Sequence, residues 1–295
     1  MSEAVLFDRV ALIGIGLIGS SLARRIKREG MARHVTTTAL TQAELDTALR
    51  LGIVDSASLS AAETVAGADL VMVCAPVGAY GAIGEAIAPA LKPGAIVSDV
   101  GSVKQCVIRD LGPYIPEGVH FVPGHPIAGT EHSGPEAGFA EMFEGRWCIL
   151  TPPPGSDAAA VEKVAELWRR CGLMIEVMDP GHHDQVLAIT SHLPHLIAFT
   201  IVGTAADLGT QIEQEVIKFA ASGFRDFTRI AASDPIMWRD VFLNNRDALL
   251  DACGRLQEDL AQLQRAIRWG EGERIESLIR RTREIRRRLI DARQA

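Results

Sequence analysis

Apolar and polar positions alternate along the first 180 residues in a way that predicts strands and helices in turn. An apolar run at 9–13 leads into a glycine-rich turn, and helical periodicity follows it. Further apolar or β-branched runs predict strands at 34–40, 68–76, 95–102, 118–126, 146–155 and 173–178. The segments between them predict helices at 41–52, 81–94, 103–115 and 158–172. This alternation predicts an α/β fold with a doubly wound parallel sheet.

The pattern changes after Asp179-Pro180-Gly181, where strand signals stop and long helical stretches begin. Residues 182–208 are apolar on most faces, which predicts a deeply buried helix. The chain from Asp247 is amphipathic, with apolar side chains along one side of the predicted helix at Leu249, Leu250, Cys253, Leu256, Leu260 and Leu263. We therefore expect two domains, a Rossmann-type domain at 1–180 and an all-helical domain at 181–295.

Composition narrows the class of protein. The chain has 295 residues, of which 47% are hydrophobic and 23% charged, so a sizeable core is expected. Aromatic residues are only 5% and the net charge is −7, which argues against a nucleic-acid partner. The basic stretch 280–289 is interpreted as a solvated helix face or a subunit contact, with an anionic partner as the alternative.

The cysteines predict neither disulfides nor a metal site. The chain has five of them, with no CxxC pair and no His-Cys ligand spacing. The first residues lack the basic and apolar regions of a signal peptide, and no uninterrupted apolar run reaches membrane-spanning length. The expectation is a cytoplasmic protein with no metal.

The turn at Gly14-Ile15-Gly16-Leu17-Ile18-Gly19 has the G-x-G-x-x-G spacing. It follows a predicted strand and opens a predicted helix, which is the context that a dinucleotide-binding turn requires. Its glycines permit the tight turn, the approach of a pyrophosphate and close helix–strand packing. A tight turn without a ligand is the alternative.

The predicted adenosine end lacks a clear selectivity signal. An acidic residue after the second strand favours NAD, and an Arg there favours NADP. This chain has Thr38-Ala39-Leu40-Thr41 instead, and Thr41 could hydrogen-bond to either cofactor. We expect NAD or NADP with limited discrimination.

Three polar loops follow predicted strands, and ligands bind at the carboxyl ends of such strands. The loop at 74–79 brings Pro76 to the nicotinamide side, and the loop at 99–104 brings Ser102 and Lys104. Ser102 could instead cap the next helix, and Lys104 is expected at the surface.

The third loop, GHPIAGTEHSG at 124–134, is dense in proton-handling groups between glycines. His125 is the candidate proton acceptor, with a strand-end histidine bonded to backbone as the alternative. Thr130 and Glu131 lie in the same loop, and Glu131 could instead be a first-turn helix charge.

The helical domain adds a second polar cluster. His192 and His195 lie three apart, and therefore on one helix face, and a zinc site is disfavoured because no third ligand accompanies them. The His182-His183-Asp184 run is interpreted as a helix start. Arg225 and Arg229 flank Asp226, which suits a carboxylate clamp or an internal salt bridge.

The ordered set GIGLIGSSLA, DVGSVK, GHPIAGTEHSG, TSHLPH and GFRDFTRIAASDPIMWRD strongly resembles prephenate/arogenate (cyclohexadienyl) dehydrogenases of tyrosine biosynthesis. The resemblance covers nearly the whole chain. It implies an N-terminal Rossmann-type domain and a C-terminal helical domain that forms a homodimer. It also implies oxidative decarboxylation of prephenate or L-arogenate with hydride transfer to NAD(P).

The resemblance also implies residue roles. His125 would accept the proton of the ring hydroxyl, and Ser102 would support His125 and that hydroxyl close to the nicotinamide. Arg229 would bind a substrate carboxylate. Trp238 would reach the neighbouring subunit's site. The remaining pocket positions that match the family are Thr130, Glu131, His192, His195, Ser233 and Met237.

Two rival functions stay open at this point. A β-hydroxyacid or imine-type dehydrogenase shares the two-domain plan but typically uses a catalytic Lys or Asp in its helical domain. A non-catalytic dinucleotide sensor would bind cofactor without turnover.

Overall fold

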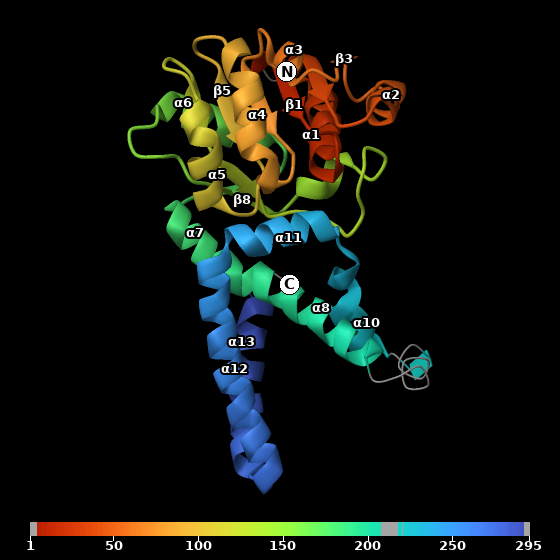
Figure 1. The fold of residues 1–295 in the computed structure, drawn as a ribbon, viewed down its shortest axis with the longest axis vertical. Helices are drawn as coiled ribbons and strands as arrows, with labels where there is room; N and C mark the ends of the chain where they lie inside the picture. The colour runs from red at the N-terminus through yellow and green to blue at the C-terminus, as the bar shows by residue number, and fades with distance from the viewer. Residues whose placement is uncertain (1–4, 208–217, 220, 292–295) are drawn as a thin grey trace. The chain divides into compact units, whose positions relative to one another are not determined.

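The computed structural model describes residues 5–207, 218–219 and 221–291, and Figure 1 shows its fold. The chain divides into two compact units, Met1–Arg246 and Asp247–Ala295. The first holds every strand and every candidate site residue among the described residues.

The first unit contains a six-stranded parallel sheet in the order β3-β2-β1-β4-β5-β6. Its strands are β1 Phe7–Ile13, β2 Ala32–Thr38, β3 Ser56–Ala57, β4 Leu70–Val73, β5 Ile96–Asp99 and β6 His120–Val122. The predicted Rossmann-type parallel sheet is confirmed, although the two-residue strand β3 is too short to give a sequence signal.

Helices cover both faces of this sheet. They are α1 Leu17–Arg28, α2 Gln42–Arg50, α3 Ala61–Val65, α4 Tyr80–Ile87, α5 Lys104–Leu111 and α6 Ala158–Arg170. Short helical turns lie at η1 Val77–Ala79, η2 Ala88–Ala90, η3 Gly112–Tyr114 and η4 Ala140–Phe143. Along β1, Val10 and Leu12 belong to one core cluster while Ala11 and Ile13 belong to the other. The period-2 alternation of a strand thus buries both faces, as expected of a parallel sheet.

A second, three-stranded sheet departs from the prediction. It consists of β7 Gly124–Pro126, β8 Trp147–Leu150 and β9 Met174–Val177, with β7 antiparallel to β8 and β8 parallel to β9. The sequence predicted a continuation of the parallel sheet, which is wrong for these strands. Pro123 separates β6 from β7, and since proline has no N–H, it cannot continue the ladder.

The rest of the first unit is helical, as predicted. It contains α7 Pro180–Leu187, a π-helical turn η5 Ala188–His192, α8 Leu193–Ala206, α10 Ser222–Thr228, η6 Arg229–Ala232 and α11 Pro235–Asn244. Figure 1 shows α11 against one end of the parallel-sheet part and α8 beyond it. Residue 208, the last of the predicted apolar stretch, lies outside the described residues.

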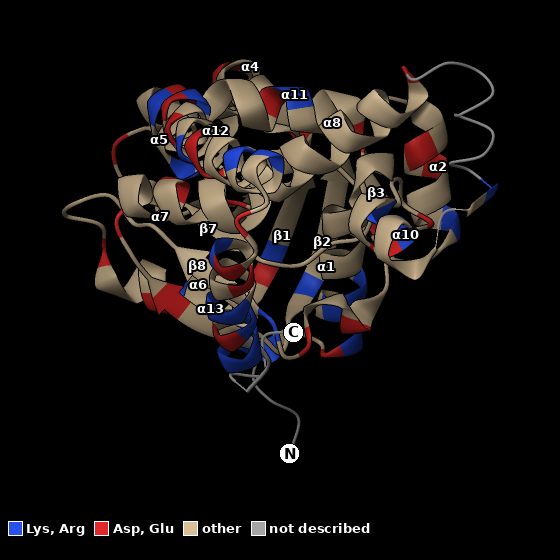
Figure 2. Cartoon of the chain, turned by 90° about the horizontal axis from the view of Figure 1, so that it is seen from below, with Lys and Arg blue, Asp and Glu red and all other residues tan. Residues whose placement is uncertain are grey.

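Helix α8 carries no charged residue, and Figure 2 shows it tan throughout. Within the described chain, Pro180–Ala206 is one helical run whose length and apolar composition would suffice to cross a bilayer. The prediction of deep burial holds for Ala198 but not for Ile201 and Val202, which are 40% and 39% exposed. This helix therefore has apolar side chains that the other described residues leave partly uncovered.

The second unit is a pair of helices, α12 Arg246–Trp269 and α13 Gly272–Asp291. Gly270, with a φ of +67°, ends α12 in a left-handed conformation. Leu250 and Leu260 on the predicted apolar side of α12 are more than half exposed. The basic side chains of α13 whose burial is described are exposed, and Figure 2 shows blue segments along its ribbon.

The domain boundary that the sequence predicts, at residue 180, lies between β9 and α7. It stays a prediction, because compactness groups α7 to α11 with the sheet part and separates only the chain from Asp247 onward.

Candidate active site

The glycine turn has the shape that a dinucleotide-binding turn needs. Gly14 has a φ of +102°, and a Cβ there would lie 2.8 Å from the Cys74 carbonyl oxygen. A Cβ on Gly19 would collide with the Gly14 carbonyl oxygen, whereas one on Gly16 would meet nothing within 4 Å. Helix α1 starts directly after Gly16 without a side-chain cap or an acidic residue in its first turn. The open space at Gly16 and the uncapped N–H groups of α1 therefore fit a pyrophosphate.

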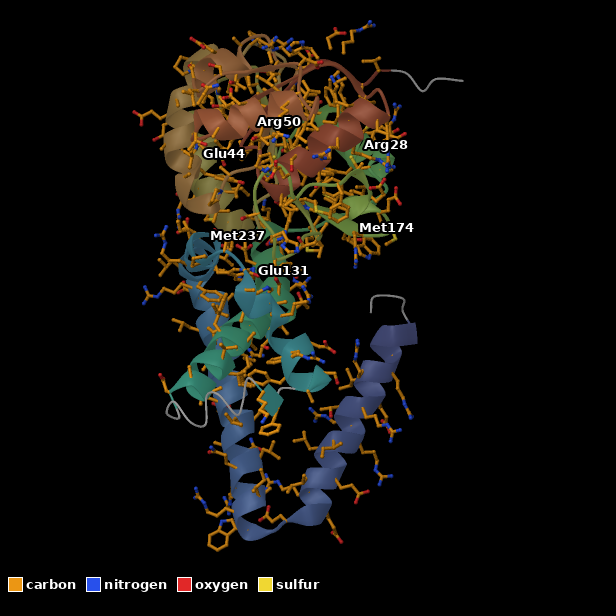
Figure 3. The ribbon with its side chains drawn as sticks, turned by 90° about the vertical axis from the view of Figure 1, so that its right-hand side faces the viewer. Arg28, Glu44, Arg50, Glu131, Met174 and Met237 are labelled. Atoms are coloured by element: carbon orange, nitrogen blue, oxygen red, sulfur yellow. The ribbon has the colours of Figure 1, made fainter. Side chains whose placement is uncertain are left out.

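Thr41, the residue expected at the adenosine end, is an exposed helix cap. Its Oγ1 accepts a hydrogen bond from the Glu44 backbone N–H at 3.3 Å and donates one to Glu44 Oε2 at 2.8 Å. Glu44 is labelled on α2 in Figure 3. This capping box occupies the Thr41 hydroxyl, so a ribose would have to compete with Glu44 for it. Thr41's role in cofactor binding stays a prediction.

The loop with Pro76 approaches α11. Pro76 is exposed and precedes η1, and a Cβ on Gly78 would collide with the Asp240 carboxylate of α11. A larger residue at position 78 would displace the Asp240 side chain. The 74–79 loop and the helix that carries Met237 and Trp238 are thus adjacent.

Lys104 is fully buried, and the expectation that it lies at the surface is wrong. Its ammonium group donates to Asp99 Oδ2 at 2.6 Å and to the Gly124 carbonyl oxygen at 2.5 Å. Asp99 Oδ1 also accepts from the Gly124 N–H at 3.1 Å. A buried charge persists only when it is paired and hydrogen-bonded, and this pair fixes the backbone that precedes His125.

His125 is buried at 8% exposure, and its Nδ1 lies 2.9 Å from His183 Nε2. His183 Nδ1 in turn lies 2.8 Å from Asp184 Oδ1. The alternative in which His125 bonds to backbone is therefore wrong for Nδ1. Burial is the main cause that lowers the pKa of His125 well below 6.5, and the nearby His183 and Lys104 add to it.

Asp184 caps the N-terminus of α5, although it lies 80 residues away in the sequence. Its Oδ1 accepts from the Lys104 N–H at 2.7 Å and its Oδ2 from the Gln105 N–H at 3.0 Å. The alternative role of Ser102 as the cap is wrong, since the cap residue is Val103 and Asp184 supplies the acceptors. The sequence signal for this contact was the His182-His183-Asp184 run, whose partners only the fold reveals.

His192 ends the π-helical turn that joins α7 to α8, and it is fully buried. Its Nδ1 lies 2.9 Å from Asn245 Nδ2, while Nε2 has no partner of hydrogen-bond geometry within the described chain. Burial lowers the pKa of His192 to about 4, although Asp184 and the Ser102 backbone oppose that shift. Single π-turns inside helices often occur at functional sites.

His195 stacks on Trp238 with ring centroids 3.6 Å apart, and His192 meets the same indole edge-on at 6.1 Å. The prediction that the two histidines share a face is confirmed by this common neighbour. Trp238 is only 6% exposed and also packs against Phe199 and Phe242 of its own chain.

Arg229 forms an ion pair with Glu131, at 2.7 Å between Nη1 and Oε2. Arg229 thus forms the internal salt bridge that was the alternative to a carboxylate clamp, and its partner Glu131 lies in a loop rather than in a helix. Figure 3 shows Glu131 and Met237 at the same end of the parallel-sheet part. Thr130, in the same loop as Glu131, accepts from the His132 N–H at 3.3 Å, and Ser233 precedes Asp234, the N-cap of α11.

These contacts bring most of the predicted residues into one neighbourhood. His192 links His125 and the Ser102 backbone electrostatically to Trp238, and His195 links Trp238 to Arg229 and so to Glu131. The arrangement offers a buried neutral imidazole and a surface cation, and the 74–79 loop connects it to the Gly14–Gly19 turn. Thr41 lies apart from these contacts and bonds to Glu44. No cluster of metal-ligating side chains occurs within the described part of the chain.

Two family models together match most of the chain. Residues 22–177 match the model described as prephenate dehydrogenase, nucleotide-binding domain, and residues 179–282 match prephenate dehydrogenase, dimerization domain. The chain belongs to the prephenate dehydrogenase family. It is therefore an NAD(P)-dependent oxidoreductase, as the sequence motifs predicted.

Individual relatives agree. The chain is 41% identical to the cyclohexadienyl dehydrogenase of Zymomonas mobilis over 90% of this chain and 91% of that protein. It is 34% identical to the prephenate dehydrogenase of Bacillus subtilis over 92% of this chain and 73% of that one.

Solved structures agree as well. The prephenate dehydrogenase of A. aeolicus in complex with hydroxyphenyl propionate and NAD+ superimposes with a TM-score of 0.87 at 36% identity, covering 96% of this chain and 98% of that one. Synechocystis arogenate dehydrogenase superimposes with a TM-score of 0.78 at 27% identity, covering 95% and 99%.

Proposed function

We propose that the protein oxidatively decarboxylates prephenate, L-arogenate or both, and transfers hydride to NAD or NADP. The products would be 4-hydroxyphenylpyruvate and L-tyrosine respectively. Family membership and the similarity to enzymes named for both substrates support this reaction. The observation that carries it is the buried, neutral imidazole of His125 beside the Ser102 loop.

The reaction needs a base, a cation and a bound hydride acceptor. When the ring hydroxyl loses its proton, the ring carbon can release hydride, and loss of the ring carboxylate as carbon dioxide then makes the ring aromatic. His125 would take the hydroxyl proton, because a neutral imidazole is a competent base near neutral pH. Ser102, in the adjoining loop, would hold the hydroxyl and His125 in register.

Substrate binding would rest on the groups that surround the aromatic cluster. Arg229, whose side chain is 59% exposed, would exchange its Glu131 partner for a substrate carboxylate. His192 Nε2, which is buried and has no partner of full hydrogen-bond geometry among the described residues, would supply a second polar contact. The other proposed pocket residues are Thr130, His195, Ser233, Met237 and Trp238.

The cofactor would lie on the glycine turn, with its pyrophosphate at Gly16 and the start of α1. When bound, it would accept the hydride. Pro76 and Ser102 would border its nicotinamide, and Gly14, Ile15, Leu17, Ile18 and Gly19 would form the rest of the turn. With no acidic side chain at 38–41, we propose that both NAD and NADP are used.

A homodimer of a cytoplasmic protein is proposed from the dimerization-domain match and from the exposed apolar residues of α8 and α12. The role of Trp238 in the neighbouring subunit's site stays a prediction. Its stacking on His195 of the same chain supports an additional role in its own subunit's pocket. Mixing inactive Trp238→Ala and His125→Asn variants tests sharing: recovery of activity in the mixture is expected only if Trp238 serves the partner.

The decisive experiment measures reduction of each cofactor with each substrate by the absorbance of the reduced nicotinamide. Turnover of prephenate or arogenate is expected with both cofactors. Cofactor binding without any turnover would favour a dinucleotide sensor. Turnover only of β-hydroxyacids or imines would favour the other rival dehydrogenases.

A further inference from the structure

Three buried side chains form a hydrogen-bonded row that ends at the proposed base. His125 Nδ1 lies 2.9 Å from His183 Nε2, and His183 Nδ1 lies 2.8 Å from Asp184 Oδ1. His183 and Asp184 are 0% and 1% exposed. They come from α7, whereas His125 comes from β7, so the row joins two elements distant in sequence.

The chemistry of the row fixes where each proton sits. An ionised carboxylate only accepts hydrogen bonds, and Asp184 already accepts two backbone N–H groups at the start of α5. His183 Nδ1 must therefore carry the proton that bonds to Asp184. In the neutral His183 ring, Nε2 is then an acceptor, so His125 Nδ1 must carry the proton between the two rings.

We propose that His183 and Asp184 are positioning residues that hold His125 in the tautomer with a proton on Nδ1 and a bare Nε2. Nε2 is the atom that must be bare to take the substrate's hydroxyl proton. The other neutral tautomer would present an N–H to the substrate and could not act as a base. The proposal rests on the proposed role of His125.

The row also stabilises the product of proton transfer. When His125 gains a proton, its Nδ1–H bond to His183 becomes charge-assisted, and the Asp184 carboxylate lies at the far end of the row. Lys104 and His192 both act electrostatically on His125, and Lys104 raises the cost of a second positive charge there. Asp184 partly offsets that cost.

The tautomer can be measured on the unaltered enzyme. Nitrogen-15 NMR of the histidine-labelled full-length protein with bound cofactor distinguishes protonated from bare ring nitrogens. The His125 signals are assigned by their absence in His125→Asn. The expected spectrum has His125 protonated at Nδ1 and bare at Nε2. Protonation at Nε2 in the neutral form would overturn the proposal.

Two substitutions of His183 separate positioning from packing. His183→Phe fills the space but removes both nitrogens, and kcat is expected to fall by about 100-fold or more with KM within about threefold. His183→Gln keeps an amide oxygen that can accept from His125 Nδ1, and is expected to recover at least about tenfold of that loss. If packing alone mattered, Phe would equal or exceed Gln, and that result would overturn the proposal.

Two further measurements complete the design. His182→Gln, a substitution of the exposed neighbouring histidine, is the matched control and should keep unaltered kinetics. If His125→Asn retained full kcat, the proposed base would be wrong, yet the NMR result would still report the tautomer. The two failures are therefore distinguishable.

Discussion

At the scale of single residues, burial rather than charge pairing decides the state of the histidines. Burial lowers the pKa of His125, His183 and His192, and in His183 the bond to Asp184 only partly opposes this effect. Since a neutral imidazole accepts protons and an imidazolium does not, burial keeps the proposed base ready for use. The same burial makes the folded protein less stable when the pH falls.

The pH profile of kcat/KM tests this state of His125. Because the pKa of His125 lies well below 6.5, its neutral form persists at neutral and mildly acidic pH. We expect kcat/KM to stay level as pH falls from about 8 to 6.5 and to drop only below that range. An acid limb with its midpoint at 6.5 or above would contradict the lowered pKa of His125.

Arg229→Ala should act mainly on KM. The variant removes the proposed partner of a substrate carboxylate, but Arg229 is 59% exposed and water screens its charge. We therefore expect KM to rise about 10- to 100-fold with a small change in kcat. Arg229→Lys keeps the charge without the guanidinium geometry, so its KM should lie between that of the unaltered protein and that of the Ala variant. Steady-state kinetics with unaltered KM in the Ala variant would refute the clamp.

At the scale of elements, the glycine turn contains glycines of two kinds. Some are required by the packing of the protein itself, and others leave open space for a ligand. A Cβ on Gly19 would strike the Gly14 carbonyl oxygen, whereas a Cβ on Gly16 would enter open space. Gly16 also has an ordinary φ of −67°, so alanine there carries no left-handed strain.

Gly16→Ala and Gly19→Ala form a matched pair of variants. Gly16→Ala should keep Tm within about 2 °C, because nothing in the protein opposes the new methyl group. It should weaken cofactor binding at least about tenfold, since the methyl group fills the proposed pyrophosphate space. Gly19→Ala should lower Tm itself. Calorimetric binding and thermal unfolding measure both, and unchanged affinity in Gly16→Ala would argue against the cofactor position.

The same scale shows what the sequence could and could not predict. Apolar runs and caps predicted the parallel strands and most helices, because these signals are local. The antiparallel pairing of β7 depends on which strand lies beside it after Pro123, which no local pattern states. The same is true of the burial of Lys104, whose ammonium group bonds to Asp99 five residues away. It is also true of the contact between His125 and His183, which are 58 residues apart.

At the scale of the whole molecule, the buried histidines make the fold sensitive to acid. The folded-state pKa of His192 is about 4, against 6.5 for the ordinary side chain. Between these values the unfolded chain binds a proton that the native protein does not. Stability must therefore fall as pH decreases from 6.5 toward 4, by on the order of 3 kcal/mol for this residue alone.

Thermal unfolding across that pH window tests the effect. Tm of the unaltered protein should fall steadily as the pH is lowered from 6.5 to 4. His192→Gln should show a shallower slope in the same window, whatever its Tm at neutral pH, because it has no imidazole to protonate. The exposed His132→Gln variant should keep the original slope. Equal slopes in all three proteins would contradict the acid-sensitive role of His192.

The carboxylate of Asp184 serves both segments that the family models assign to different domains: it caps α5 on one side and holds His183 on the other. Recombination between relatives at the border between the two family segments would therefore also replace the partners with which α5 and His125 form hydrogen bonds. A chimera would inherit a competent proton acceptor only if the incoming helical half supplied an imidazole and an acid in the same register. Such hybrids should sort into active and silent groups according to that two-residue match rather than according to overall identity.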